Sequence, residues 1–172
     1  MERLDFSYSI WLMPEGEMKK RVWSIIKTHH EKYNSPLFEP HVTLIGGFIG
    51  KEKEMKNKAE MLASKLNTFT VKIEGISYLD EFFRSLFFKV EKGLELLEAR
   101  KRAEKVFCLK KEAYMPHMSL VYGNFELKDK QEMMKNIDHG FSAEFKVKKI
   151  HIVTNDEKNF VWTVKESYNL SR

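Results

Sequence analysis

Two ten-residue stretches of the sequence share a pattern of residues that could act as acids and bases. The first is FEPHVTLIGG, residues 38–47, and the second is YMPHMSLVYG, residues 114–123. Proline, histidine, leucine and glycine recur at the same places in both stretches, and Thr43 of the first stands where the second has Ser119. A single histidine before a threonine is most often structural. Two copies, each following a proline, favour a shared chemical role.

The spacing of the motif residues predicts which of them point the same way. In an extended strand, side chains alternate between the two faces. His41 therefore shares a face with Thr43 and, by strict alternation, with Ile45, while His117 shares a face with Ser119. Each motif thus offers an imidazole and a hydroxyl about 7 Å apart along the strand. Apolar residues on the opposite faces are expected to anchor both strands in the core.

Two imidazoles can act as an acid and a base at neutral pH, because the unperturbed pKa of histidine is about 6.5. One of His41 and His117, when neutral, would accept a proton from attacking water, and the other, when charged, would give one to the leaving oxygen. The hydroxyls of Thr43 and Ser119 would donate hydrogen bonds to phosphate oxygens as negative charge develops. The pattern predicts in-line hydrolysis of a phosphodiester with no metal ion and no cofactor.

Other residues carry weaker signals. Trp11 and Tyr122 could contact a nucleotide or serve in the core, Phe83 could stack on a base, and Arg84 could pair with phosphate or lie on the surface. Cys108 has no base nearby in the sequence to make it a nucleophile. No glycine-rich loop of the Walker or Rossmann type is present. Four further histidines lack the motif context and are expected to be structural or exposed: His29, His30, His139 and His151.

The composition is that of a folded globular protein. The chain has 172 residues, of which 42% are hydrophobic and thirteen are phenylalanine, whereas disordered chains contain few aromatic residues. A net charge of +5 favours anionic partners. A single cysteine permits no internal disulfide, so we expect a reducing, cytoplasmic compartment. No stretch reaches the roughly 18 apolar residues of a membrane span, and no signal peptide is recognisable, so no membrane association is expected.

The hydrophobic pattern predicts strands and helices in alternation around the motifs. Strands are expected at residues 6–14, 41–48, 69–80, 82–91, 116–123, 141–155 and 159–170. Helices are expected at residues 15–33, 51–66, 93–107 and 128–137. The third helix is expected to bury Leu94, Leu97, Ala103 and Val106. Several strands follow one another as hairpins, which indicates an α+β fold with largely antiparallel sheets. No Pro-, Gly- or Ser-rich linker divides the chain, so we expect one domain of two similar lobes over residues 1–172.

The paired motifs resemble the His-x-Thr/Ser-hydrophobic signature of the two-histidine (2H) phosphoesterase superfamily, with HVTL at 41–44 and HMSL at 117–120. The contexts YSIWLMP, PLFEPHVTL and YMPHMSLVY are more specifically similar to the plant and yeast cyclic nucleotide phosphodiesterases. The resemblance covers most of the chain. It implies a bilobal, pseudo-symmetric α+β fold, in which two mainly antiparallel sheets line a central cleft with helices outside. It also favours His117 as the base and His41 as the acid.

The activity implied by this resemblance is metal-independent opening of 2′,3′-cyclic phosphates to 2′-phosphates, together with hydrolysis of ADP-ribose 1″,2″-cyclic phosphate. Superfamily relatives instead cleave 2′-5′ oligoadenylate or act on RNA ends, and these remain alternatives. A non-catalytic nucleotide- or RNA-binding module is a third reading, against which the intact histidines and hydroxyls argue. We expect a monomer whose partner is a nucleotide or ADP-ribose cyclic phosphate, with RNA ends as the alternative partner.

Overall fold

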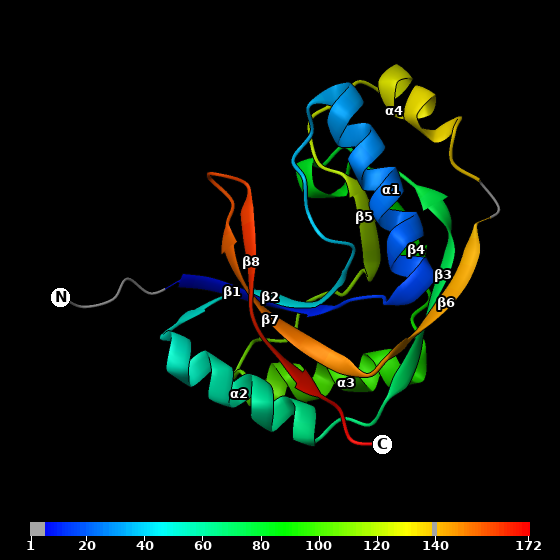
Figure 1. The fold of residues 1–172 in the computed structure, drawn as a ribbon. Helices are drawn as coiled ribbons and strands as arrows, with labels where there is room; N and C mark the ends of the chain where they lie inside the picture. The colour runs from blue at the N-terminus through cyan, green and yellow to red at the C-terminus, as the bar shows by residue number, and fades with distance from the viewer. Residues whose placement is uncertain (1–5, 139–140) are drawn as a thin grey trace.

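Residues 6–138 and 141–172 are described by the computed structural model, and they form a curled sheet flanked by helices (Figure 1). The strands are β1 (Phe6–Leu12), β2 (Val42–Gly50), β3 (Phe69–Ser77), β4 (Leu86–Val90), β5 (His117–Val121), β6 (Ser142–Val147), β7 (Lys149–Asp156) and β8 (Val161–Asn169). The helices are α1 (Gly16–Tyr33), α2 (Glu52–Ser64), α3 (Leu94–Val106) and α4 (Leu127–Met134), with a 3-10 turn η1 at Phe82–Arg84.

The sheet has two halves that meet at one short contact. Across the described residues its order is β6-β3-β4-β5-β2-β1-β7-β8, and all neighbouring strands are antiparallel. The halves join where β5 meets β2, and the register there consists of one pair, Val42 opposite Met118. The predicted α+β class with mainly antiparallel strands is confirmed. The two expected sheets are the halves of this one sheet, joined edge to edge.

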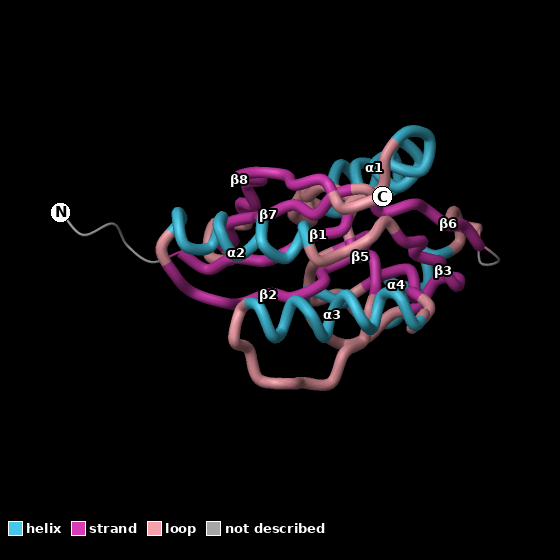
Figure 2. The backbone as a smooth tube through the Cα atoms, turned by 90° about the horizontal axis from the view of Figure 1, so that it is seen from below, coloured by secondary structure: helices cyan, strands magenta, loops and turns pink. Residues whose placement is uncertain are grey.

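The helices cover the sheet in two pairs. α1 lies beside α4 and packs against β5, whereas α2 lies beside α3 and packs against β7 and β8 (Figure 1). Figure 2 shows α1 and α3 on opposite sides of the strands. Among the described residues, no helix is long and apolar enough to cross a membrane.

Two expected strands differ from those observed. The stretch expected as one strand at 141–155 is two strands, because at Lys148 the chain passes from β6 in one half of the sheet to β7 in the other. The stretch expected as a strand at 82–91 begins with the turn η1. That turn is held by tertiary contacts, since the carbonyl of Phe82 accepts a hydrogen bond from the backbone N–H of Gly123. Local periodicity carries no signal for either contact.

The buried face of α3 is also different from the expected one. Leu96, Ala99 and Ala103 are buried, whereas Leu94 is 86% exposed and Leu97 lies at the surface. The buried residues follow the i, i+3, i+7 spacing of one helix face. Leu94 is the first residue of the helix. The prediction holds for Ala103, which is buried, and for Val106, which is partly buried against the core, and it is wrong for the two leucines near the start of the helix.

A β-bulge interrupts the first motif strand directly after its hydroxyl residue. On β1, Trp11 lies opposite Thr43 and Ile10 lies opposite Ile45, so Leu44 is an extra residue without a partner on β1. A bulge of this kind moves the following side chain to the other face. Ile45 is consequently fully buried in the apolar core. The prediction from strict alternation, that Ile45 shares the face of His41, is therefore wrong.

The second motif strand has the same bulge at the equivalent position. On β4, Phe87 lies opposite Ser119 and Leu86 lies opposite Val121, which leaves Leu120 as the extra residue. This leucine, like its counterpart in the first motif, is fully buried. The leucine that recurs in the two motifs thus corresponds to one backbone feature, which the two halves share.

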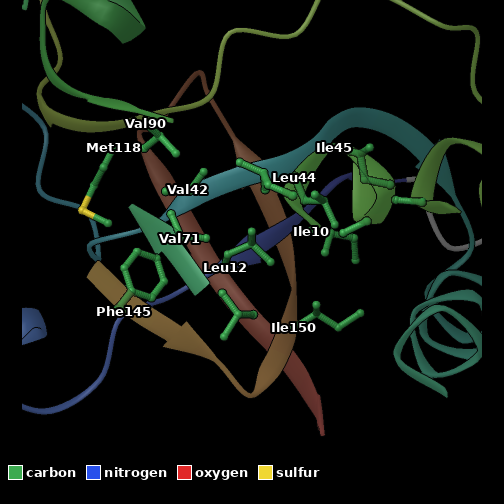
Figure 3. Close-up of a cluster of buried hydrophobic side chains, with 14 of the residues drawn as sticks. Ile10, Leu12, Val42, Leu44, Ile45, Val71, Val90, Met118, Phe145 and Ile150 are labelled. Atoms are coloured by element: carbon green, nitrogen blue, oxygen red, sulfur yellow. The ribbon is translucent and has the colours of Figure 1, made fainter. Parts of the chain in front are cut away.

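A continuous apolar core lies behind the junction of the halves (Figure 3). It contains side chains from both: Val71, Val90, Met118 and Phe145 on one side, and Ile10, Leu12, Val42, Leu44, Ile45 and Ile150 on the other. Because apolar burial is the main favourable term in folding, this cluster stabilises the arrangement of the two halves as well as each half separately.

Met118→Ala is expected to lower the free energy of unfolding by about 2–5 kcal/mol, since Met118 is fully buried at the junction and truncation leaves a cavity there. Urea unfolding followed by circular dichroism measures the loss. Met61→Ala is the matched control, because Met61 is 50% exposed and its truncation should change stability by no more than about 0.5 kcal/mol. Equal losses in the two variants would contradict the role given to the junction.

Candidate active site

The pair that joins β2 to β5 brings the two motifs together. Extending this antiparallel register by one residue in each direction directs His41 toward Ser119 and Thr43 toward His117. The paired residues themselves are buried in the core, which leaves these four side chains on the opposite face. All four line one cavity of about 250 Å³. The structure thus brings together the four residues that the motifs predicted.

A backbone carbonyl two residues earlier orients each imidazole. Nδ1 of His41 lies 2.6 Å from the carbonyl oxygen of Glu39, and Nδ1 of His117 lies 2.8 Å from that of Met115. A carbonyl oxygen only accepts, so Nδ1 carries the proton and donates in both rings. In each motif a proline separates the two residues, and its fixed φ helps to hold the carbonyl in place. Nε2 is consequently the atom of each ring that can take up or give a proton.

An aromatic ring lies against each imidazole. Trp11 stacks on His41 with 3.5 Å between ring centroids and 5° between ring planes. Phe87 contacts His117 edge-on, at 5.5 Å between centroids. Each aromatic residue stands opposite the hydroxyl residue of its motif and is 3% exposed. The local sequence pattern did not mark Phe87 as part of the site, because its place depends on the pairing of β4 with β5.

Burial lowers the pKa of both motif histidines. His41 is 5% exposed, and desolvation lowers its pKa to about 3, against the opposing effect of its bond to the Glu39 carbonyl. Desolvation is also the largest cause of the lowered pKa of His117, and the positive charge of Arg84 lowers it further. At neutral pH both imidazoles are therefore uncharged in the free protein.

The hydroxyl of Ser119 has a partner in the protein. Its Oγ donates to the carbonyl oxygen of Phe83 at 2.9 Å, and the side chain is 4% exposed. Thr43 is half-buried, and its carbonyl oxygen accepts a hydrogen bond from the hydroxyl of Tyr114 at 2.9 Å. Both hydroxyl residues line the cavity, although Ser119 must rotate its O–H away from Phe83 to donate into it.

Aromatic side chains form one wall of the cavity, and the three candidates Trp11, Tyr122 and Phe83 all line it. Tyr122 is only 6% exposed and stacks on Phe38 with centroids 3.8 Å apart, whereas Phe83 is 37% exposed. Trp162 of β8 lines the same wall at 5.4 Å from Tyr122. The accessible aromatic surface is thus that of Phe83 and Trp162. Local sequence patterns carry no signal for Trp162, which reaches the wall through the β7–β8 hairpin.

A second hollow of about 420 Å³ lies directly beside the first. The two hollows share Thr43, Gly46, Gly47, Arg84 and His117. Within the described part of the chain, His117 lines both hollows and His41 lines the first alone. Arg100, Lys110 and Glu112 contribute charged groups to the second. Arg84, which the sequence favoured as a surface residue, thus lies at the boundary between the two hollows.

His29, His30 and His151 line neither hollow. His29 and His30 bond to backbone carbonyls, and His151 bonds to a serine hydroxyl at 2.7 Å. His139 falls outside the described residues, and Cys108 is exposed. Over residues 6–138 and 141–172, no group of three or more histidine, cysteine or carboxylate side chains could hold a metal ion.

Comparisons with known proteins agree with this geometry. The family model of the 2′-5′ RNA ligase superfamily matches residues 14–159. A cyclic phosphodiesterase of Arabidopsis thaliana is 26% identical over 157 residues, covering 88% of this chain and 87% of the relative. The fold is similar to that of E. coli LigT complexed with 3′-AMP, with a TM-score of 0.70 at 12% identity over 98% of this chain and 99% of the other. A protein of Thermus thermophilus gives a TM-score of 0.67 at 16% identity, covering 95% of this chain and 97% of the other. The chain therefore belongs to the 2′-5′ RNA ligase superfamily, the two-histidine phosphoesterases that its paired motifs indicate.

Proposed function

We propose that the protein is a cyclic phosphodiesterase, which hydrolyses 2′,3′-cyclic phosphates or ADP-ribose 1″,2″-cyclic phosphate to the monoester. The observation that carries this proposal is that His41 and His117 line one cavity together with the hydroxyl residues of both motifs, beside the pair that joins the two motif strands. The name of the Arabidopsis relative and the 3′-AMP in the LigT crystal support a nucleotide phosphate as the ligand.

The reaction follows from the atoms that face the cavity. The phosphate lies between the motifs, where Thr43 and Ser119 donate to its non-bridging oxygens. Nε2 of the base removes a proton from water while the water oxygen bonds to phosphorus. The bond to the 3′ oxygen breaks on the opposite side, and that oxygen takes the proton from Nε2 of the acid. Each Nδ1–H remains bonded to its carbonyl and keeps the ring in place.

Three features support His117 as the base and His41 as the acid. The departing oxygen of a cyclic phosphate stays on the ribose, which the accessible aromatic wall holds on the side of the first hollow. Water must attack from the opposite side, and His117 lines the second hollow as well as the first. The positive charge of Arg84 also disfavours a charged His117, as a base requires, although Glu81, which is paired with Arg84, acts in the opposite direction.

The acid must be charged, although burial lowers the pKa of His41 to about 3 in the free protein. A bound phosphodiester brings a negative charge next to the ring, which favours the imidazolium and raises its pKa. The indole of Trp11, stacked on the ring, acts in the same direction, because an aromatic face attracts a cation. Substrate binding is therefore coupled to the uptake of a proton.

The second hollow favours a substrate with one nucleoside over a 2′-5′ linked dinucleotide. A dinucleotide would place its second nucleoside beyond the phosphate, where a base could stack on an exposed aromatic face. Tyr114 is the aromatic residue among those lining the second hollow, and the Arg100 guanidinium lies 4.5 Å over its ring. The wall that could hold a second base is thus already covered by a side chain.

Purified protein in excess chelator is expected to hydrolyse 2′,3′-cyclic nucleotides or ADP-ribose 1″,2″-cyclic phosphate, with products identified by chromatography.

His41→Ala and His117→Ala should each lower kcat about 10²–10⁴-fold, as loss of a general acid or base does. Thr43→Ala and Ser119→Ala should cost less, since the two hydroxyls share one anion.

Hydrolysis of none of these cyclic phosphates would refute the proposal, as would more than a tenth of wild-type activity in either histidine variant. Preference for 2′-5′ dinucleotides or RNA ends would favour the alternative substrates. Nucleotide binding without turnover of any substrate would favour a non-catalytic module.

An activated leaving group should rescue the acid variant more than the base variant. Bis(p-nitrophenyl) phosphate has a leaving group that departs without a proton, so loss of the acid matters less with it than with a cyclic nucleotide. His41→Ala should therefore retain a larger fraction of wild-type kcat on this diester than His117→Ala does. The reverse order would exchange the two roles. Rescue of neither variant would contradict the assignment of His41 as the acid and His117 as the base.

The pH profiles of kcat and kcat/KM are expected to have different optima. kcat/KM reports the free protein, in which both pKa values are lowered, so its optimum should lie below pH 6.5 and it should fall as the pH rises through neutrality. kcat reports the complex, in which the bound anion raises both pKa values, so its optimum should lie at higher pH. Initial rates between pH 4 and 9 test this, and a kcat/KM optimum above pH 7 would contradict it.

A further inference from the structure

The pairing of the first motif strand is interrupted directly after its hydroxyl residue, Thr43. The register of β2 with β5 consists of Val42 and its partner, and the bulge at Leu44 breaks the pairing with β1. Two carbonyl oxygens of this stretch accept hydrogen bonds from side chains outside the sheet. The hydroxyl of Tyr114 donates to Thr43 at 2.9 Å, and Nη1 of Arg100 donates to Leu44 at 2.7 Å.

The two donors are themselves held in place. Nε of Arg100 donates to Glu104, one turn along α3, at 2.7 Å, and the side chains of this pair are 16% and 12% exposed. The guanidinium lies 4.5 Å over the ring of Tyr114. Burial also raises the pKa of Tyr114, so its hydroxyl remains a donor throughout the neutral range. Arg100 and Tyr114 thus form a rigid unit, hereafter the β2 clamp, that spans α3, the loop before β5, and β2.

The second motif is held differently. Phe38 stands in the first motif where Tyr114 stands in the second, and it has no hydroxyl to donate. It stacks on Tyr122 instead. β5 is paired with β4 on both sides of its bulge, as β2 is with β1, so the two motifs differ in these side chains and not in their strand pairing. The clamp is therefore an addition to one half of a nearly symmetric site.

We propose that Arg100 and Tyr114 are positioning residues, which fix the backbone of β2 so that the Thr43 hydroxyl meets the phosphate. This inference rests on the proposed function. Neither side chain needs to touch the substrate in this role. The hydroxyl of Thr43 matters most as charge develops on the phosphate, so a small displacement should lower kcat more than it raises KM.

A double-mutant cycle tests whether the clamp acts through Thr43. Tyr114→Phe removes one hydroxyl and keeps the ring, and Arg100→Lys keeps the charge but loses the fork of donors. Each is expected to lower kcat by about three- to tenfold with KM changed less than about twofold, the size of one hydrogen bond. In a Thr43→Ala background the same changes should have almost no further effect on kcat.

Arg102→Lys is the matched control. Arg102 lies on the same helix and makes the same kind of contacts, to Glu98 and to the carbonyl of Lys65, but it lines neither hollow. It should leave kcat unchanged. Equal losses of kcat with and without Thr43 would overturn the proposal. Raised KM at unchanged kcat would also overturn it, since Arg100 or Tyr114 would then bind the substrate directly.

A measurement without substrate separates this proposal from the proposed function. The methyl resonance of Thr43, followed by NMR in the free protein, should shift and broaden in Tyr114→Phe and stay unchanged in Arg102→Lys. This result would support the clamp even if the wild-type protein hydrolysed none of the cyclic phosphates. An unchanged Thr43 resonance in Tyr114→Phe would overturn the clamp, whatever the activity of the wild-type protein.

Discussion

The pairing of Val42 with Met118 is the contact on which the geometry of the site depends. Both residues are fully buried, and their pair is where the two halves of the sheet share a register. Because it joins the two motif strands, it brings the histidine and the hydroxyl residue of each motif to the same cavity. A slip of either motif strand by one residue would turn the imidazole of that strand toward the core. The apolar cluster behind the junction therefore protects the register as much as it stabilises the fold.

The repeated phrase in the sequence has a structural use at nearly every position. The proline precedes the histidine and helps to fix the carbonyl that holds Nδ1. The hydroxyl residue two positions later points to the same face. The leucine that follows is the bulge residue in both strands, at Leu44 and Leu120. One sequence pattern thus encodes one local conformation, and two copies are needed because each half supplies one side of the cavity.

The features predicted from the sequence depend on neighbouring residues, whereas most of the features that were missed depend on contacts between residues far apart in the sequence. The motif residues, the helices and most strands follow from periodicity within a few neighbouring positions. Phe87 was missed because it reaches the site through the pairing of β4 with β5, which is distant in sequence. Trp162 was missed because the β7–β8 hairpin carries it to the cavity. The division of one expected strand at Lys148 has the same cause, since only the partners show that the chain changes halves. The bulge at Leu44 was missed as well, and with it the burial of Ile45, because a pattern of period two cannot show where an extra residue enters.

Near-symmetry brings the two imidazoles together, but the proposed hydrolysis requires them to differ, because an acid and a base cannot share one protonation state. The difference comes from residues outside the motifs. His41 lies deeper, under the face of Trp11, whereas His117 meets the edge of Phe87 and the charge of Arg84. A stacked face favours a cation, and a neighbouring cation opposes one. The paired motifs thus supply two equivalent groups, and the residues around them give the two imidazoles different surroundings.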